Sequence, residues 1–274
     1  MRKIHYPLIV SDFDGTLANS ESEISERTKR AVQEYVESGG KFGLCTGRMT
    51  ESILKKAREL GLKGLIASYQ GAVITDLDSG KNLLEGGLSV EEGIEICELF
   101  EGLGLHIHVY ELNGFYSNMD DEPLRMYERI CGVKAKIFDG KFSALLRSEN
   151  IKPVKILVMV APDEREKVYR AAVEKFGERY YVTYSAAFLV EVTSKAYSKA
   201  TALEFLANYY GVPMEKTVAV GDNMNDLPML QAAGLGFAVK NADEGLKAKV
   251  RTYAYANDED AVARIIEEYG FTKE

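Results

Sequence analysis

The chain has 274 residues, of which 46% are hydrophobic and 28% charged, with a formal net charge of −8 and a pI near 5.2. This length exceeds one average domain, and the composition is that of a soluble globular protein. The acidic balance argues against nucleic acid as a partner, because binding to a phosphate backbone requires a basic surface.

The sequence contains no apolar stretch long enough to cross a bilayer, so no membrane association is expected. The first residues lead directly into a short apolar segment and do not resemble a signal peptide. The three cysteines are odd in number and widely spaced, which argues against a disulfide framework: Cys45, Cys97 and Cys131. We therefore expect a cytoplasmic protein.

The first part of the chain alternates between strand and helix patterns. An apolar strand is expected over Pro7–Ser11, a helix over Ser25–Ser38 and a second strand over Lys41–Thr46. A further helix leads to a strand over Gly64–Ser68 and a hairpin-like stretch over 72–84. This alternation predicts an α/β fold with a doubly wound, Rossmann-like and mostly parallel sheet.

The middle of the chain has a different pattern. Helical segments at Ser89–Gly102 and Asp163–Phe176 are mixed with alternating strands at Leu105–Tyr110 and Lys155–Val160. Beyond this stretch the strand–helix alternation resumes, which an inserted α+β domain explains. The predicted organisation is a core domain over 1–84, an inserted cap domain over 85–192 and the rest of the core over 193–274.

Three of the predicted parallel strands end in polar residues. The first ends in Asp12–Thr16, the second in Thr46–Arg48 and a late one in Gly221–Asp226. Ligands of open α/β sheets bind at the carboxyl ends of strands, and carboxylates suit Mg²⁺. Each motif alone also fits a turn or a helix cap, whereas their coincidence at three strand ends favours one shared site.

These motifs resemble the signatures of the haloacid dehalogenase superfamily. Asp12–Leu17 resembles the first signature, Thr46 the second, Lys199 the third and Gly221–Asp226 the fourth. The similarity covers about 4–84 and 193–270, and is typical of the Cof-type phosphatases with an inserted α/β cap of type C2. Further similar segments are Leu227–Leu230, Ala233–Gly234, Asn241–Ala242 and Asn257–Val262.

The resemblance implies a role for each matching residue. Asp12 would attack phosphorus and form an aspartyl-phosphate, while Asp14 would act as general acid and then general base. Lys199 would offset the repulsion between carboxylate and phosphate. The implied phosphate-binding residues are Thr46, Gly47, Lys199 and Asn225. The implied Mg²⁺ ligands are Asp12, Asp14 through its main-chain carbonyl, Asp222 and Asp226. Asp226 would either bind the metal directly or support the residues that bind it.

The function implied by the resemblance is a Mg²⁺-dependent phosphatase, a phosphoric monoester hydrolase acting on small phosphorylated metabolites such as sugar phosphates. A phosphomutase or phosphotransferase would use the same residues and differ only in its product. A non-enzymatic metabolite-binding sensor would instead have lost catalytic residues, whereas all of them are present here. The sequence is compatible with a monomer or a homodimer.

The chain departs from the family pattern at two positions. Ala200 follows Lys199 where the family commonly has glycine, and alanine suits a helix start. Gln70 precedes Gly71 where the family usually has asparagine, which would alter a contact near the hinge of the inserted cap. Arg48 is common in the second signature and can also pair with an acid.

Several other residues invite a functional interpretation. His106 and His108 lie on one face of a predicted strand, where we expect a surface position or a substrate contact more than a metal pair. Cys45 is expected to be a packed strand residue, and 120–122 a solvated loop. The tyrosines of interest on predicted strands of the inserted domain are Tyr110, Tyr116 and Tyr184.

Overall fold

The computed structural model describes residues 2–272, and its contacts divide the chain into two compact units. The core unit consists of Met1–Gly47, Ile53–Leu84 and Ser198–Glu274. The inserted unit consists of Arg48–Ser52 and Glu85–Tyr197. The contacts thus end the insertion at Tyr197 and assign Arg48–Ser52 to it.

The core unit is built on an eight-stranded sheet in the order β14-β13-β12-β1-β2-β3-β4-β5. The strands from β14 to β3 pair in parallel, and β4 is antiparallel to β3. The predicted mostly parallel α/β sheet is therefore confirmed. The strands are β1 (Leu8–Ser11), β2 (Lys41–Cys45), β3 (Leu65–Ser68), β4 (Val73–Asp76), β5 (Lys81–Glu85), β12 (Thr217–Gly221), β13 (Leu235–Ala238) and β14 (Arg251–Thr252).

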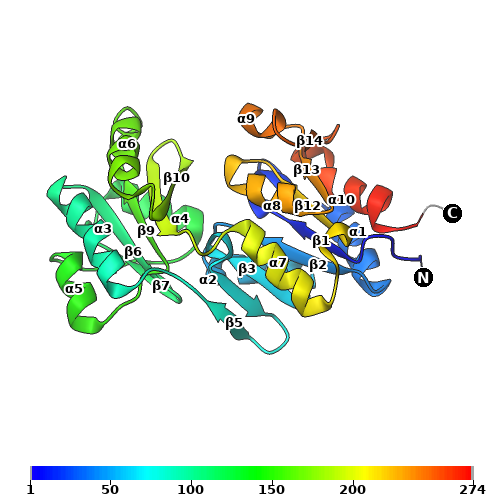
Figure 1. Ribbon diagram of the computed structural model, residues 1–274, viewed down its shortest axis with the longest axis horizontal. Coiled ribbons are helices and arrows are strands. Elements are labelled where there is room, and N and C mark those ends of the chain that lie inside the picture. The colour runs from blue at the N-terminus through cyan, green and yellow to red at the C-terminus, as the bar shows by residue number, and fades with distance from the viewer. Residues whose placement is uncertain (1, 273–274) are drawn as a thin grey trace. The chain divides into compact units, whose positions relative to one another are not determined.

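Helices cover both faces of this sheet. Every residue of β1 and β12 is buried, which an open sheet achieves only when both of its faces are covered. Helix α7 packs against α8, and α1 packs against α10 (Figure 1). The helices of the core are α1 (Glu26–Glu37), α2 (Thr50–Glu59, which belongs to the core from Ile53 onward), α7 (Lys199–Tyr210), α8 (Leu227–Ala232), α9 (Glu244–Lys247) and α10 (Ala261–Ile265).

The inserted unit contains a six-stranded sheet in the order β10-β11-β9-β6-β7-β8 (Figure 1). Its pairs are antiparallel except for β7 and β8, which confirms the predicted α+β character. Its strands are β6 (His106–Glu111), β7 (Gly114–Ser117), β8 (Lys136–Ile137), β9 (Lys155–Met159), β10 (Tyr180–Ala186) and β11 (Leu189–Ser194). Its helices are α3 (Val90–Gly102), α4 (Glu122–Cys131), α5 (Phe142–Glu149) and α6 (Arg165–Phe176).

The two histidines of β6 are buried, so the prediction of a surface position is wrong. His106 is 7% exposed and His108 is fully buried. The ring of Tyr127, on α4, lies 5.2 Å from the His108 ring and helps to cover this face of the sheet. His106 Nε2 is 2.8 Å from Ser117 Oγ and 3.1 Å from His108 Nε2, so the pair belongs to an internal hydrogen-bonded cluster.

The predicted loop at 120–122 is wrong only at its last residue, because Asp120 and Asp121 precede α4 and Glu122 begins it. Asp121 caps α4, because its Oδ1 accepts a 2.9 Å hydrogen bond from the amide of Leu124. Within residues 2–272, no helix is both long and apolar enough to cross a membrane.

Candidate active site

Asp12 lies directly beyond the carboxyl end of β1 and is 6% exposed. Its amide donates a 2.9 Å hydrogen bond to the carbonyl of Val220 on the neighbouring strand β12. The chain then makes a tight turn over Phe13–Leu17, in which Asp14 is extended and exposed. The sheet therefore fixes Asp12, whereas Asp14 depends on the turn.

This turn is tied to the end of β12 through Asp222. Gly15 has a φ of +69°, and an added Cβ there would lie 2.5 Å from Asp222 Oδ2. Thr16 Oγ1 donates a 2.9 Å hydrogen bond to Asp222 Oδ1. Glycine is required at position 15 both for its left-handed conformation and for this close approach.

Lys199 enters the site from the first turn of α7. Ser198 caps the helix in a reciprocal capping box with Thr201, which fixes where the helix begins. The Lys199 side chain is fully buried, and its Nζ lies 2.9 Å from Asp12 Oδ1 and 2.5 Å from Asp226 Oδ1. The ammonium group therefore joins Asp12 to the loop after β12.

Both oxygens of Asp226 are engaged within the protein. Oδ1 accepts from Lys199, and Oδ2 accepts from the amides of Asp222 at 3.0 Å and Asn223 at 2.9 Å. One carboxylate oxygen each from Asp12, Asp222 and Asp226 lie within 4.8 Å of one another. The structure thus brings together three of the predicted metal ligands, with Asp226 also shaping the loop.

The buried charges perturb one another strongly. Burial raises the pKa of Asp12 well above its usual range, and burial together with the charge of Asp226 raises the pKa of Asp222 to about 6. Burial alone would lower the pKa of Lys199, but the carboxylates of Asp12 and Asp226 outweigh it and raise that pKa. Carboxylates crowded around one ammonium form a site in which an added cation would relieve the repulsion.

Two of the predicted phosphate-binding residues follow β2. Thr46 is 1% exposed, and its amide donates a 3.0 Å hydrogen bond to the carbonyl of Ala67. Gly47 comes next, but α2 begins only at Thr50. Thr46 and Gly47 therefore lie in the loop between β2 and α2.

Asn225, the remaining predicted phosphate-binding residue, contacts a residue from another strand end. Its Nδ2 donates a 3.0 Å hydrogen bond to Gln70 Oε1. Gln70 in turn lies against Gly47, since a Cβ at Gly47 would be 2.5 Å from Gln70 Nε2. Gln70 therefore links the ends of β2 and β12.

Comparison with known proteins identifies the family. The model of the haloacid dehalogenase-like hydrolases matches residues 9–266, which is most of the chain. The chain belongs to the haloacid dehalogenase-like hydrolases. A Haemophilus influenzae protein named for an inferred phosphatase activity is 30% identical over 269 residues, covering 96% of this chain and 98% of the relative. The predicted superfamily, and with it the phosphatase class of enzyme, is confirmed.

Two further similar proteins support the assignment to this family. The 5-amino-6-(5-phospho-D-ribitylamino)uracil phosphatase YitU of Bacillus subtilis is 26% identical over 267 residues, covering 96% of this chain and 97% of its own. The crystal structure of a haloacid dehalogenase-like hydrolase from Bacteroides thetaiotaomicron superposes with a TM-score of 0.84 at 28% identity, covering 96% of this chain and 98% of that one. Almost the whole chain therefore has the fold of this hydrolase family.

Sequence reasoning missed the residues that support the turn of this hydrolase after Asp12. Asn241 Nδ2 donates a 2.8 Å hydrogen bond to the carbonyl of Gly15, and Asn241 Oδ1 accepts from the amide of Asn257 at 2.9 Å. Asn257 Nδ2 donates to the carbonyl of Ala18 at 3.0 Å. Both asparagines lie in segments that match the family, which was the available signal, but their partners Gly15 and Ala18 are more than 200 residues away in sequence.

Cys45, at the end of β2, is fully buried, and burial raises the pKa of its thiol to about 12. A thiol that is both inaccessible and protonated is a packing residue, as predicted.

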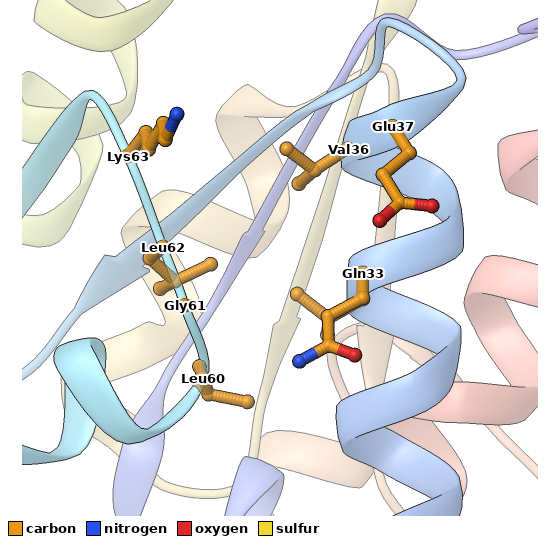
Figure 2. A pocket seen from close by; sticks show the side chains of 8 residues that line it. Gln33, Val36, Glu37, Leu60, Gly61, Leu62 and Lys63 are labelled. Carbon is orange, nitrogen blue, oxygen red and sulfur yellow. The ribbon is translucent and has the colours of Figure 1, made fainter.

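A groove of about 390 Å³ lies elsewhere on the core unit of this hydrolase. It lies between α1 and the segment after α2, with Gln33 and Val36 on one side and Leu62 on the other (Figure 2). No predicted site residue lines it, so it is distinct from the candidate active site.

Proposed function

We propose that this hydrolase is a Mg²⁺-dependent phosphatase that acts on small phosphorylated metabolites through an aspartyl-phosphate on Asp12. The observation that carries the proposal is the buried contact of 2.9 Å between Asp12 Oδ1 and Lys199 Nζ. A nucleophilic carboxylate must approach a phosphate dianion, and an adjacent ammonium group reduces the repulsion between them.

The acidic residues around Asp12 fit a hard divalent cation. Asp12 and Asp222 would hold Mg²⁺ together with the main-chain carbonyl of Asp14. Asp226 would orient Asp222 and Lys199, because both of its oxygens already accept hydrogen bonds. When bound, Mg²⁺ would neutralise part of the negative charge of the phosphoryl group and of the carboxylates.

The reaction would proceed in two displacements. In the first, a carboxylate oxygen of Asp12 bonds to phosphorus, the phosphorus–ester oxygen bond breaks, and the leaving oxygen takes the proton of Asp14. In the second, Asp14 takes a proton from a water molecule, whose oxygen bonds to phosphorus. The bond between phosphorus and the Asp12 oxygen breaks, which releases inorganic phosphate and restores the Asp12 carboxylate.

The phosphoryl oxygens would be held by donors that follow two strands and by Lys199 at the start of α7. Thr46 and Gly47 follow β2, Asn225 follows β12, and Lys199 supplies the charge. Because these groups are fixed by the sheet and by α7, little reorganisation is needed as the transferring group becomes planar.

The substrate class rests on a relative. The YitU phosphatase takes its name from a phosphorylated metabolite of small size, and it matches this chain over almost its full length. We infer that the present chain also acts on a small phosphomonoester.

The mechanism is tested by release of phosphate from p-nitrophenyl phosphate by the full-length protein. Wild-type protein should be active with Mg²⁺ and inactive after EDTA treatment, with recovery on adding Mg²⁺ back. Asp12→Asn should lose about a thousandfold in kcat or more, while the exposed Asp139→Asn should be unaffected. Near-normal turnover by Asp12→Asn would show that Asp12 is not the nucleophile.

A panel of phosphorylated metabolites then defines the substrate class. Hydrolysis gives inorganic phosphate in proportion to substrate consumed. An isomeric phosphoester without free phosphate would instead identify a phosphomutase.

A further inference from the structure

Gln70 lies in a backbone turn of unusual conformation after β3. The φ angles are +50° at Tyr69, +60° at Gln70 and +96° at Gly71, so three successive residues are left-handed. This conformation is unfavourable for residues with a Cβ and persists only where the surrounding structure enforces it. Such strain is frequently found at functional sites.

The turn is held on both sides by the candidate active site. The amide of Gln70 donates a 2.9 Å hydrogen bond to the carbonyl of Thr46. On the other side, Gly71 is packed against the residue before Lys199, since a Cβ at Gly71 would lie 2.4 Å from the Ser198 carbonyl oxygen. Gln70 is therefore fixed between the end of β2 and the start of α7.

The side chain of Gln70 is buried but only half satisfied. The residue is 6% exposed, and its Oε1 accepts the hydrogen bond from Asn225 Nδ2. Among residues 2–272, its Nε2 group has no hydrogen-bond acceptor. Since this Nε2 is not fully buried, it can donate to an acceptor from outside the chain.

A second donor without a partner lies beside it. Nε2 of Gln70 is in contact with Gly47, where a Cβ would be only 2.5 Å away. The main-chain amide of Gly47 also has no acceptor within the described residues. Two neighbouring donors, one from a side chain and one from the backbone, suit a ligand whose oxygens only accept, such as a phosphoryl group.

We infer that Gln70 binds the substrate phosphoryl group directly, with Nε2 donating to a phosphoryl oxygen beside the amide of Gly47. This inference rests on the proposed phosphatase function and adds a phosphate-binding residue to it. The Oε1 of Gln70 would not contact phosphate, because it accepts the hydrogen bond from Asn225 and orients that carboxamide. As a neutral amide, Gln70 adds a donor without adding a charge to the site.

The test measures binding of inorganic phosphate by calorimetry in the presence of Mg²⁺. Gln70→Met keeps the length of the side chain and removes both donor and acceptor. We expect the Kd for phosphate to rise about tenfold or more, as expected when a hydrogen bond to a charged group is lost. The matched control is Gln33→Met at an exposed position of α1, which should leave the Kd for phosphate unchanged.

A double-mutant cycle separates direct contact from action through Asn225. If Gln70 binds phosphate itself, Gln70→Met weakens phosphate binding by a similar factor in the Asn225→Ala background. Loss of the effect in that background would overturn the inference, because Gln70 would then be only a positioning residue for Asn225.

A second variant covers the case in which Gln70→Met fails to fold, as judged by circular dichroism. Gln70→Glu has the same shape and can still accept from Asn225, but it has no donor when ionised, so it should also weaken phosphate binding. A Kd within twofold of wild type in a folded Gln70 variant overturns the inference. Failure of the wild type to hydrolyse any phosphomonoester would refute the proposed phosphatase function, a result distinct from these.

Discussion

At the scale of single residues, this protein buries charged and titratable groups in two different ways. In the core unit, Lys199 is fully buried and stays charged because Asp12 and Asp226 contact its ammonium group. In the inserted unit, His106 and His108 are buried with hydrogen bonds mainly to neutral partners. The first arrangement favours the ionised form, whereas the second favours the neutral form.

The histidine pair should make stability depend on pH. Burial lowers the pKa of His108 well below its usual value, helped by the nearby charge of Lys155, and burial also lowers the pKa of His106 despite Asp121. In the unfolded chain both titrate near about 6.5. Below that pH the unfolded state binds protons that the folded state does not, so the free energy of unfolding falls as the pH decreases.

We therefore expect His108→Phe to reduce the loss of stability between pH 7 and pH 5. Each histidine contributes at most about 1.4 kcal/mol per pH unit below its unfolded pKa. Phenylalanine suits a site already lined by the rings of Phe115 and Tyr127. Urea unfolding at the two pH values measures the change, with the exposed His5→Phe as control. An unchanged loss in His108→Phe would contradict this account.

At the scale of elements, the site depends on the turn over Phe13–Leu17. This turn carries Asp14 away from β1, and its conformation is set by Gly15, by Asp222 and by Asn241 from a distant loop. Asp14, the proposed acid–base residue, is therefore positioned by tertiary contacts of the turn and not by a helix or strand of its own.

A comparison of Gly15 with Gly80, which lies outside this turn, separates the effect of backbone strain from that of steric contact. Gly15 and Gly80 both have φ of +69°, but a Cβ at Gly15 would be 2.5 Å from Asp222 Oδ2, whereas a Cβ at Gly80 would meet nothing within 4 Å. Both alanine variants should lose about 1 kcal/mol of stability or more from backbone strain. Only Gly15→Ala should also lose phosphatase activity, by about a hundredfold. Equal activities of the two variants would show that the approach to Asp222 is unimportant.

At the scale of the whole molecule, the chain contains two hydrophobic cores. The core of the inserted unit includes Phe100, Ile107 and Val158, and it is separate from the cluster around the core sheet. A unit of this size with its own core is able to fold alone.

We expect a fragment of residues 85–197 to unfold cooperatively in urea. The six-stranded sheet and its helices lie almost wholly within this segment. Circular dichroism and amide hydrogen exchange would show a single transition and protected amides in β6 and β9. A fragment that titrates without a cooperative transition would show that the inserted unit needs the core in order to fold.

The sequence alone determined the fold class and the strand ends at which the site forms. Apolar strands followed by Asp12, Thr46 and Asp222 are local patterns, and parallel strands bring their carboxyl ends to one edge of a sheet. Lys199 was identified by resemblance, and in the structure its ammonium group contacts Asp12 and Asp226.

Only the tertiary structure decided which side chains complete that site. Gln70 and Asn225 are 155 residues apart, and Asn241 reaches Gly15 across 226 residues. Likewise, β6 alone has the pattern of a half-exposed strand, and the burial of His108 requires the packing of α4. Local sequence patterns specify elements and their ends, whereas burial and hydrogen-bond partners depend on what another part of the chain brings to the same place.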